Sequence, residues 1–328
     1  MKSSALRAGV VGCGDVADVH LAAILDLPDV ELIEVCDRND ERRRQAAYRF
    51  GVPGHSDVES MIASQSLDVV HVCTPHNEHL AVARCALAHG VHVLLEKPLA
   101  ESVSTGEQLI AAAESSSATL GVCFQNRYNP TSVAMKSLLD SGDFGVVVGA
   151  RAQVMWSRTA DYYQARPWRG SWAGSGGGVL MNQAIHTIDL VQWLLGEVTA
   201  VNGSTSTLLF GETIEVEDTA VGVLEHASGI RTNLYATLTH FEHAPVFIEV
   251  TCEAAVLVLD GDLRVRFPDG REQLLAERDQ ITTARSYWGA SHERLIADFY
   301  RALRAEERFW IDGPEAARSL GIAQAFYR

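Results

Sequence analysis

The sequence lacks the cysteine pattern of a metal site or a disulfide framework. Its six cysteines include no C-x-x-C pair, and their spacing suits neither a zinc site nor a small disulfide-linked fold. Three of them, Cys13, Cys36 and Cys73, fall at or just after predicted strand ends, where cysteine behaves as a small apolar residue. We therefore expect reduced thiols and a cytoplasmic location.

Long apolar runs and excess positive charge are also missing. Residues 1–8 hold no apolar core followed by a cleavage site, so we expect neither a signal peptide nor a transmembrane segment. Acidic residues outnumber basic ones by 42 to 27, which gives a formal net charge of −15. Because nucleic acids and anionic membranes attract clustered cations, this balance argues against either as the main partner.

The length and apolar content are those of a two-domain globular protein. The chain has 328 residues, of which 47% are hydrophobic and 21% charged. Over residues 1–124, short apolar runs alternate with amphipathic segments, which is typical of an α/β domain with a doubly wound parallel sheet. Ser56 and Glu59 form a capping-box pattern that opens a short helix. The predicted strands are Arg7–Val11, Val30–Cys36, Val69–Cys73, His92–Leu95 and Leu120–Phe124.

The pattern changes after residue 124, where strand-like runs begin to predominate. One helix, Leu180–Leu195, interrupts these strands. We expect residues 125–328 to form an α+β domain with a largely antiparallel sheet, and its helical tail, residues 292–328, to pack back on the first domain. Hairpin turns are predicted at Ser228-Gly229, Asp260-Gly261 and Asp269-Gly270.

A glycine turn follows the first predicted strand. In a dinucleotide-binding (Rossmann) unit, Gly12 would permit the tight turn, Gly14 would let the backbone approach a pyrophosphate, and the small Ala17 would let helix and strand pack closely. The start of the following helix would present unpaired N–H groups to the phosphates. An ordinary strand-to-helix turn is the alternative. The predicted phosphate-binding residues are Gly12, Gly14, Asp15, Val16 and Ala17.

Two further segments are predicted to line the same cofactor. Asp37 ends the second strand, where a carboxylate accepts hydrogen bonds from both ribose hydroxyls and repels a 2′-phosphate, so NAD is favoured over NADP. Arg38 follows it and would pair with a phosphate if the loop turned it inward. Thr74-Pro75 closes the third predicted strand in a position to line the cofactor.

His76 and His79 invite interpretation as metal ligands. A His-x-x-His pair with no third ligand in view is weak evidence for a metal site. Polarity at a helix start and exposure to solvent explain the two histidines more simply, so we predict no metal.

Glu96-Lys97-Pro98 ends another predicted parallel strand, at the sheet edge where ligands bind. A lysine there would hydrogen-bond the nicotinamide ribose and a substrate oxygen, and its ammonium would stabilise the alkoxide character that develops during hydride transfer. We therefore predict Lys97 as catalytic and Glu96 as cofactor-binding. A surface lysine before a proline is the alternative.

A second polar constellation lies on the helix entered through Gly176–Gly178. Asn182, His186 and Asp189 are spaced i, i+4 and i+7, so they share one helix face. Histidine has an intrinsic pKa near neutral pH, as a general base for a hydroxyl requires. The alternative is a structural, partly buried histidine bonded to Asp189.

Together these motifs resemble the glucose-fructose oxidoreductase / inositol dehydrogenase / MocA (Gfo/Idh/MocA) family. The resemblance covers nearly the whole chain and also includes Asn126–Pro130 and Trp168-Arg169. It implies a Rossmann domain joined to a domain with a large open sheet that mediates dimers or tetramers. It further implies Lys97 and His186 as the catalytic pair, and a cis peptide bond before Pro98. Members of the family act on hydroxyl and keto groups of sugars, inositols and sugar nucleotides.

One residue departs from the family pattern. Many members carry aspartate four residues before the catalytic histidine, where this sequence has Asn182. An amide still orients a substrate hydroxyl, but it cannot raise the basicity of the histidine by charge. Simple inositol dehydrogenase activity is therefore disfavoured.

We predict an NAD-dependent dehydrogenase or reductase of a secondary hydroxyl or keto group in a carbohydrate-like substrate. The segment from Tyr162 to Arg169 is predicted to line the substrate cleft, with aromatic faces for a sugar ring and with Arg166 or Arg169 for an anionic group. In the alternative, its aromatic residues only pack the loop down. The predicted substrate-binding residues are Asn182, Arg127, Tyr163, Trp168, Arg169 and Asp189.

Three other functions remain open. A sugar-nucleotide dehydrogenase would carry out the same chemistry on a larger substrate. A redox-assisted glycosidase or lyase would oxidise and re-reduce its substrate with no net NADH. A non-catalytic NAD-binding regulator belongs to a different class, and the presence of Lys97 and His186 argues against it.

Overall fold

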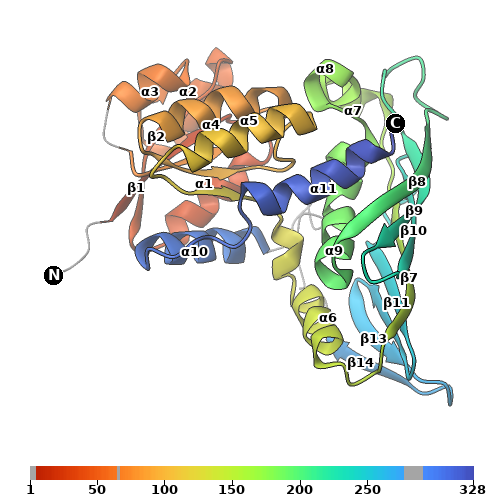
Figure 1. The fold of residues 1–328 in the computed structure, drawn as a ribbon. Coiled ribbons are helices and arrows are strands. Elements are labelled where there is room, and N and C mark those ends of the chain that lie inside the picture. Colours follow the sequence, from red (N-terminus) through yellow and green to blue (C-terminus); the bar gives the residue numbers. More distant parts are fainter. Residues whose placement is uncertain (1–4, 65–66, 277–290) are drawn as a thin grey trace. The chain divides into compact units, whose positions relative to one another are not determined.

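The structure of the protein is a computed structural model that describes residues 5–64, 67–276 and 291–328. It divides into two compact units (Figure 1). Unit 1 comprises residues 1–124 and 292–317, and unit 2 comprises residues 125–291 and 318–328. The helical tail, residues 292–328, is thus divided between the two units.

Unit 1 contains a six-stranded sheet in the order β3-β2-β1-β4-β5-β6, and all of its neighbouring strands are parallel. This is the strand order of a doubly wound dinucleotide-binding fold, so the predicted α/β architecture is confirmed. The strands are β1 (Leu6–Val11), β2 (Val30–Cys36), β3 (Gly54–His55), β4 (Val69–Val72), β5 (His92–Leu95) and β6 (Leu120–Val122).

The helices of unit 1 begin and end largely where local sequence signals place them. Gly51 adopts φ 68° directly after α2, as a C-terminal glycine cap does. The prediction of a capping box at Ser56 and Glu59 was wrong, because the Asp57 carboxylate accepts the hydrogen bond from Ser60 N at 2.8 Å. The helices are α1 (Ala17–Asp26), α2 (Asp40–Phe50), α3 (Val58–Ser64), the 3₁₀ turn η1 (His76–Glu78), α4 (His79–Ala88), α5 (Val103–Glu114), α10 (Ser291–Arg304) and α11 (Gly313–Ala325), the last of which ends in unit 2.

The segment after residue 291 completes the core of unit 1 at strand β6. Val122 N donates to Ile311 O at 2.9 Å. A Cβ atom at Gly121 would lie only 2.7 Å from the ring of Phe299 and 2.8 Å from that of Phe309, so both rings pack directly on the strand. Both phenylalanines are fully buried.

Unit 2 contains an eight-stranded sheet in the order β14-β13-β12-β11-β7-β10-β9-β8. Only β10 and β7 are parallel neighbours in it, so the predicted mainly antiparallel α+β architecture is confirmed. Gly229, Gly261 and Gly270 have positive φ at the three predicted hairpin turns. The strands are β7 (Val147–Met155), β8 (Val198–Ser206), β9 (Thr219–His226), β10 (Arg231–Thr237), β11 (Phe247–Cys252), β12 (Val256–Asp260), β13 (Asp262–Arg266) and β14 (Glu272–Ala276).

Helices α6 and α9 lie on one face of this sheet (Figure 1). The alternation along β10 agrees with this arrangement, because Leu234 and Ala236 are buried while Asn233 and Tyr235 are exposed on the opposite face. None of the helices in the described residues is long and apolar enough to cross a membrane. The helices and turns of this part of the chain are η2 (Gln125–Tyr128), α6 (Pro130–Ser141), α7 (Ala160–Gln164), η3 (Pro167–Gly170), α8 (Trp172–Ser175), the π-helical turn η4 (Leu180–Ala184) and α9 (Ile185–Leu195).

Candidate active site

The glycine turn follows β1 directly, and its two glycines have different surroundings. Gly12 has φ +91°, and a Cβ atom there would lie 2.6 Å from the Cys73 carbonyl oxygen. At Gly14 a Cβ atom would meet nothing within 4 Å. Ala17 is buried and begins α1, whose first turn has no side-chain cap. The turn therefore leaves open space at Gly14 beside a helix start that no side chain caps, as a bound dinucleotide requires.

Asp37 is held against this turn. Its Oδ2 accepts from Cys13 N at 2.8 Å, and its Oδ1 accepts from Asn39 N at 2.7 Å. Arg38 has a largely exposed side chain whose guanidinium pairs with Glu78 Oε1 at 2.7 Å. The carboxylate therefore stands beside the proposed phosphate turn, while the neighbouring cation is engaged by an acid.

Thr74 and Lys97 leave the sheet from the adjacent strands β4 and β5. Val72 pairs with Leu95 at the ends of these strands. Within the described residues, the buried Thr74 Oγ1 has no hydrogen-bond partner, as is expected where a ligand hydroxyl or amide docks. The Lys97–Pro98 peptide bond is cis, as the family resemblance implied.

Glu96 has its carboxylate inside unit 1, at the end of a chain of buried hydrogen bonds. His20 Nε2 lies 3.0 Å from Glu96 Oε1, and His20 Nδ1 lies 2.8 Å from His71 Nδ1. His71 Nε2 lies 2.8 Å from the Tyr300 hydroxyl. Although burial raises it, hydrogen bonds from His20 and His292 hold the pKa of Glu96 well below its usual value. Because this carboxylate faces the protein interior, the geometry favours a supporting role over the cofactor contact that we predicted for it.

The groups at the ends of this series of hydrogen bonds determine which atom donates in each of them. An ionised Glu96 only accepts, so His20 donates to it through Nε2 and accepts at Nδ1 when its ring is neutral. His71 then donates through Nδ1 and accepts the Tyr300 proton at Nε2. Burial lowers the pKa of both histidines, which favours these neutral rings. Every donor in this series of hydrogen bonds, from Tyr300 to Glu96, thus has an acceptor.

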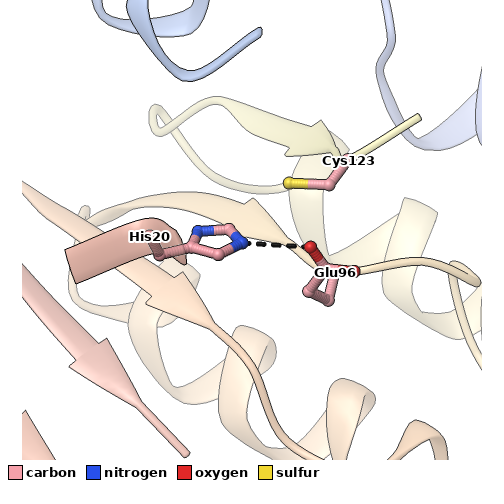
Figure 2. A group of neighbouring side chains, drawn as sticks. All are labelled: His20, Glu96 and Cys123. Atoms are coloured by element: carbon pink, nitrogen blue, oxygen red, sulfur yellow. Dashed lines mark hydrogen bonds and ion pairs between the residues drawn. The ribbon is translucent and has the colours of Figure 1, made fainter. Parts of the chain in front are cut away.

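Three atoms of this region also have the chemistry of metal ligands (Figure 2). His20 Nε2, Glu96 Oε1 and Cys123 Sγ all lie within 4.8 Å of one another. The 3.0 Å between His20 Nε2 and Glu96 Oε1 is a direct hydrogen bond, whereas two ligands of a tetrahedral zinc would stand at least roughly 3.3 Å apart. Burial raises the pKa of the Cys123 thiol well above its usual value, so the thiol keeps its proton. Hydrogen bonding alone accounts for the arrangement.

His76 and His79 are both buried, so the predicted explanation by solvent exposure was wrong. His79 Nδ1 lies 2.9 Å from Pro98 O, and its Nε2 lies 3.1 Å from Thr74 O. His79 does lie at the start of α4, as we predicted, but its imidazole ring lies between two backbone carbonyls of neighbouring loops. Sequence periodicity cannot reveal such contacts, because they join separate turns of the fold.

In unit 2, the predicted single helix over residues 180–195 is a π-helical turn followed by an α-helix. The buried Glu217 accounts for this entry. Its Oε2 accepts from Gly178 N at 2.8 Å, and its Oε1 accepts from Leu180 N at 2.9 Å and from the Tyr327 hydroxyl at 2.8 Å. Glu217 was missed in the sequence, where its only signal is an acid beside the apolar run of β9.

Asn182 and His186 lie on either side of the junction between the π turn and α9. Asn182 Nδ2 lies 3.4 Å from each of the Gly177 and Gly178 carbonyl oxygens, so this amide turns back toward the glycine loop. His186 is 9% exposed. A π turn is often found at functional sites, because it re-aims the side chains of one helical turn.

Arg127 and Asp189 form a buried ion pair within unit 2. Arg127 Nε and Nη2 each lie 2.7 Å from a different oxygen of Asp189, and both residues are 1% exposed. Ser319 Oγ also donates to Asp189 at 2.8 Å. We predicted both as substrate-binding, but this burial and mutual pairing favour a structural role that holds α9.

One aromatic ring of the predicted substrate loop lies against two guanidinium groups, that of Arg169 within the loop and that of Arg158 before it. The centroid of the Tyr162 ring lies 4.4 Å from the Arg169 guanidinium carbon and 4.8 Å from that of Arg158. Gln183, on the π turn, donates to the Tyr162 hydroxyl at 3.1 Å. Arg169 also lies near Trp168, at 5.7 Å. The loop is thus tied to the turn that carries Asn182.

Tyr163 does not share this environment. It is 3% exposed, and its ring packs 5.0 Å from Tyr162 and 5.5 Å from Phe210, measured between ring centroids. For Tyr163 the geometry favours the alternative in which an aromatic residue packs the loop down, rather than the substrate contact that we predicted.

Comparison with known proteins assigns both units. Residues 6–124 match an oxidoreductase family with an NAD-binding Rossmann fold, and residues 132–258 match the GFO/IDH/MocA C-terminal domain. The chain is similar to the D-apiose dehydrogenase of Paraburkholderia graminis, with 25% identity over 98% of this chain and 86% of that one. It is also similar to the dTDP-3,4-didehydro-2,6-dideoxy-alpha-D-glucose 3-reductase of Streptomyces violaceoruber, with 27% identity over 99% of this chain and 92% of that one.

A solved structure agrees with this assignment. The WlbA dehydrogenase of Bordetella pertussis, in complex with NADH and UDP-GlcNAcA, has a TM-score of 0.86 and 29% identity, and the match covers 99% of this chain and 96% of that one. The protein is thus an oxidoreductase with an NAD-binding domain, and the predicted cofactor is confirmed. More particularly, it belongs to the Gfo/Idh/MocA family, as the resemblance of its motifs implied.

Proposed function

We propose that the protein transfers a hydride between NAD and a secondary hydroxyl or keto group of a sugar-like substrate. NAD, when bound, supplies the hydride acceptor or donor. The observation that carries the proposal is the joint presence of an open glycine turn in unit 1 and a π turn that leads into the His186 helix in unit 2. The similar D-apiose dehydrogenase is named for a sugar substrate.

Lys97 and His186 are the proposed catalytic residues. During oxidation His186 removes the hydroxyl proton, and the Lys97 ammonium hydrogen-bonds the same oxygen while negative charge develops on it. Asn182 holds a neighbouring hydroxyl through its amide. Asp37 and Thr74 are proposed to contact the cofactor, together with the glycine turn.

A sugar nucleotide is the second candidate substrate, and one observation favours it. Arg158 and Arg169 both stand against the Tyr162 ring, and guanidinium groups suit the phosphates or carboxylate of such a molecule. The similar WlbA dehydrogenase was solved with UDP-GlcNAcA. A free sugar offers no anionic group to these arginines, so the two substrate classes are separable by charge.

The decisive experiment is a panel of sugars, polyols, sugar acids and sugar nucleotides, followed by NADH absorbance with NADP in parallel. On the best substrate, Lys97→Met and His186→Asn should each lower kcat by about 10²- to 10⁴-fold, as expected for loss of a catalytic acid or base. Lys136→Met is the matched control, because Lys136 pairs with Asp140 on α6 and should leave kcat unchanged.

The other outcomes of this panel identify the alternatives. Substrate turnover without any change in NADH absorbance would indicate a redox-assisted glycosidase or lyase. If no compound turned over, and if both variants kept every cellular phenotype, the protein would be an NAD-binding regulator rather than an enzyme.

We also infer a homodimer or homotetramer that assembles through the open face of the unit 2 sheet. Val221 and Tyr235 are 52% and 37% exposed on neighbouring strands of that face. Arg151, Asn202 and Asn233 line a shallow hollow beside them. A cytoplasmic location is supported by the six cysteines, which are all free thiols.

A further inference from the structure

We propose that His79 is a positioning residue that links the two loops at the carboxyl edge of β4 and β5, and thereby sets the position of the Lys97 ammonium. The inference rests on the proposed function, in which Lys97 and Thr74 face the cofactor. His79 is the first residue of α4 and is fully buried. It contacts neither substrate nor cofactor in this proposal and acts through the backbone.

The His79 ring lies between the two loops that follow β4 and β5. Strands β4 and β5 run side by side and end at Val72 and Leu95. His79 Nδ1 approaches Pro98 O at 2.9 Å, and Nε2 approaches Thr74 O at 3.1 Å. One rigid ring therefore fixes the distance between the residue after Lys97 and the proposed cofactor residue Thr74.

The energetics make this link specific. A buried carbonyl that loses its donor is left unsatisfied, so the loop whose carbonyl accepts from the ring is held to it. Both partners only accept, and a neutral imidazole has one N–H, so the ring donates to one carbonyl at a time. Burial lowers the pKa of His79, which favours the neutral ring, and the shorter contact is to Pro98. The stronger link is thus to the Lys97 loop.

Lys97 is held from its other side as well. The preceding residue, Glu96, is bonded through its carboxylate to His20, and its N–H donates to Val72 O at 2.9 Å. Both neighbours of Lys97 in the chain are therefore anchored by buried histidines. Because both ring nitrogens of His79 are directed at carbonyl oxygens, His79 is a bridge rather than a metal ligand.

The sequence offers a direct spectroscopic reporter of the Lys97 position. The chain contains only three lysines, Lys2, Lys97 and Lys136, so protein labelled with ¹³C at the lysine Cε gives three side-chain signals. Lys97→Arg identifies the signal of interest, and Lys136 in unit 2 provides an internal reference. Titration with NADH, followed by this signal and separately by fluorescence, needs neither a substrate nor turnover.

Three substitutions at His79 separate the two contacts. The amide nitrogen of asparagine stands near the position of Nδ1, and that of glutamine near the position of Nε2. We expect His79→Ala to weaken NADH binding about tenfold and to keep the Lys97 signal from reaching its bound position at saturation. His79→Asn, which keeps the contact to Pro98, should restore the Lys97 shift. His79→Gln, which keeps the contact to Thr74, should restore NADH affinity but not the Lys97 shift. His89→Ala, at the exposed far end of α4, should change neither.

The inference fails if His79→Ala reproduces the wild-type Lys97 shift and NADH affinity. If the alanine variant does not fold, the inference fails when both His79→Asn and His79→Gln reproduce them. It also fails if the asparagine and glutamine variants are equally impaired in both measurements, since a merely structural histidine would give that result. A wild-type Lys97 signal that NADH does not move would instead overturn the proposed placement of Lys97, and with it the proposed function.

Discussion

Gly12 and Gly14 stand two residues apart in one turn, yet they are glycine for different reasons. At Gly12 the φ is positive, and a Cβ atom would lie 2.6 Å from the Cys73 carbonyl oxygen, so any side chain is excluded. At Gly14 the protein itself leaves room. Under the proposed function, the restriction at Gly14 comes from the cofactor that approaches the backbone, and the two positions can be separated experimentally.

Gly14→Ala should keep the free energy of unfolding within about 1 kcal/mol of wild type and weaken NADH binding at least tenfold. Gly12→Ala should instead lower the free energy of unfolding by about 2–4 kcal/mol, because strain and overlap add at that site. Urea unfolding and NADH titration of both variants measure the two effects. A Gly14→Ala variant that loses stability but binds NADH normally would contradict this assignment.

Asp37 should determine the choice between NAD and NADP. Its carboxylate lies at the glycine turn, and Arg38 is paired with Glu78 rather than directed at a phosphate. Asp37→Ala should therefore weaken NAD binding about tenfold, or ~1.4 kcal/mol, while NADP loses much less because the repulsive charge is gone. Calorimetric titration with both cofactors tests this, with Asp40→Ala on the exposed start of α2 as the control. Equal losses for NAD and NADP would argue against the role of Asp37.

At the scale of elements, the strands and most helices follow from the sequence because their signals are local. Alternating apolar runs, proline and glycine stops, and glycine turns suffice to locate them. The π turn at Leu180–Ala184 does not follow in this way. It depends on Glu217, which reaches it from beside β9 and is joined by Tyr327 near the end of the chain. Because Glu217 contacts residues far from it in the sequence, hydrophobic periodicity does not reveal its role.

The same limit applies to the candidate site. The positions of Gly12, Asp37 and Lys97 could be predicted because each closely follows a strand of the parallel sheet. Their buried supports, His20 and His79, could not, because their partners lie on other elements of unit 1. Motifs thus locate the candidate residues, while the packing that holds them in place must be read from the structure.

Glu217→Ala should destabilise unit 2, because the N–H groups of Gly178 and Leu180 would lose their acceptor inside the protein. We expect a loss of about 2–4 kcal/mol in the free energy of unfolding. Glu217→Gln should recover part of this loss, because its single carbonyl oxygen can accept from Leu180 N and the Tyr327 hydroxyl, whereas its NH2 group would face the N–H of Gly178. The exposed Glu215→Ala is the matched control, and urea denaturation measures all three. Equal losses for the alanine and glutamine variants would rule out this account.

The buried histidines of α1 and β4 should make the protein sensitive to acid. Burial lowers the pKa of His20 and His71 in the folded state. Their contribution to the free energy of unfolding is therefore complete above the unfolded pKa of about 6.5, and it is lost as the pH falls below that value. The free energy of unfolding should therefore decrease between pH 7 and pH 5. His71→Asn should flatten this decrease, whereas His89→Asn, at an exposed position, should not. Parallel pH profiles for wild type and His71→Asn would contradict the prediction.

At the scale of the whole molecule, each unit supplies a different part of the proposed reaction. Unit 1 holds the dinucleotide edge with Lys97, and unit 2 holds His186 and a sheet with one open face. A net charge of −15 makes copies of the chain repel one another, so self-association requires a patch where apolar contacts outweigh that repulsion. The exposed strip around Val221 and Tyr235 provides such a patch.

Val221→Asp combined with Tyr235→Asp should convert the proposed dimer or tetramer to a monomer, because two carboxylates would have to be desolvated in the interface. Tyr48→Asp is the matched control, because Tyr48 is 92% exposed on α2 of unit 1 and so lies outside the unit 2 sheet. Size-exclusion chromatography with light scattering gives the mass, and circular dichroism confirms that each variant is folded. A monomeric wild type, or equal dissociation of the Tyr48→Asp control, would show that this face does not carry the assembly.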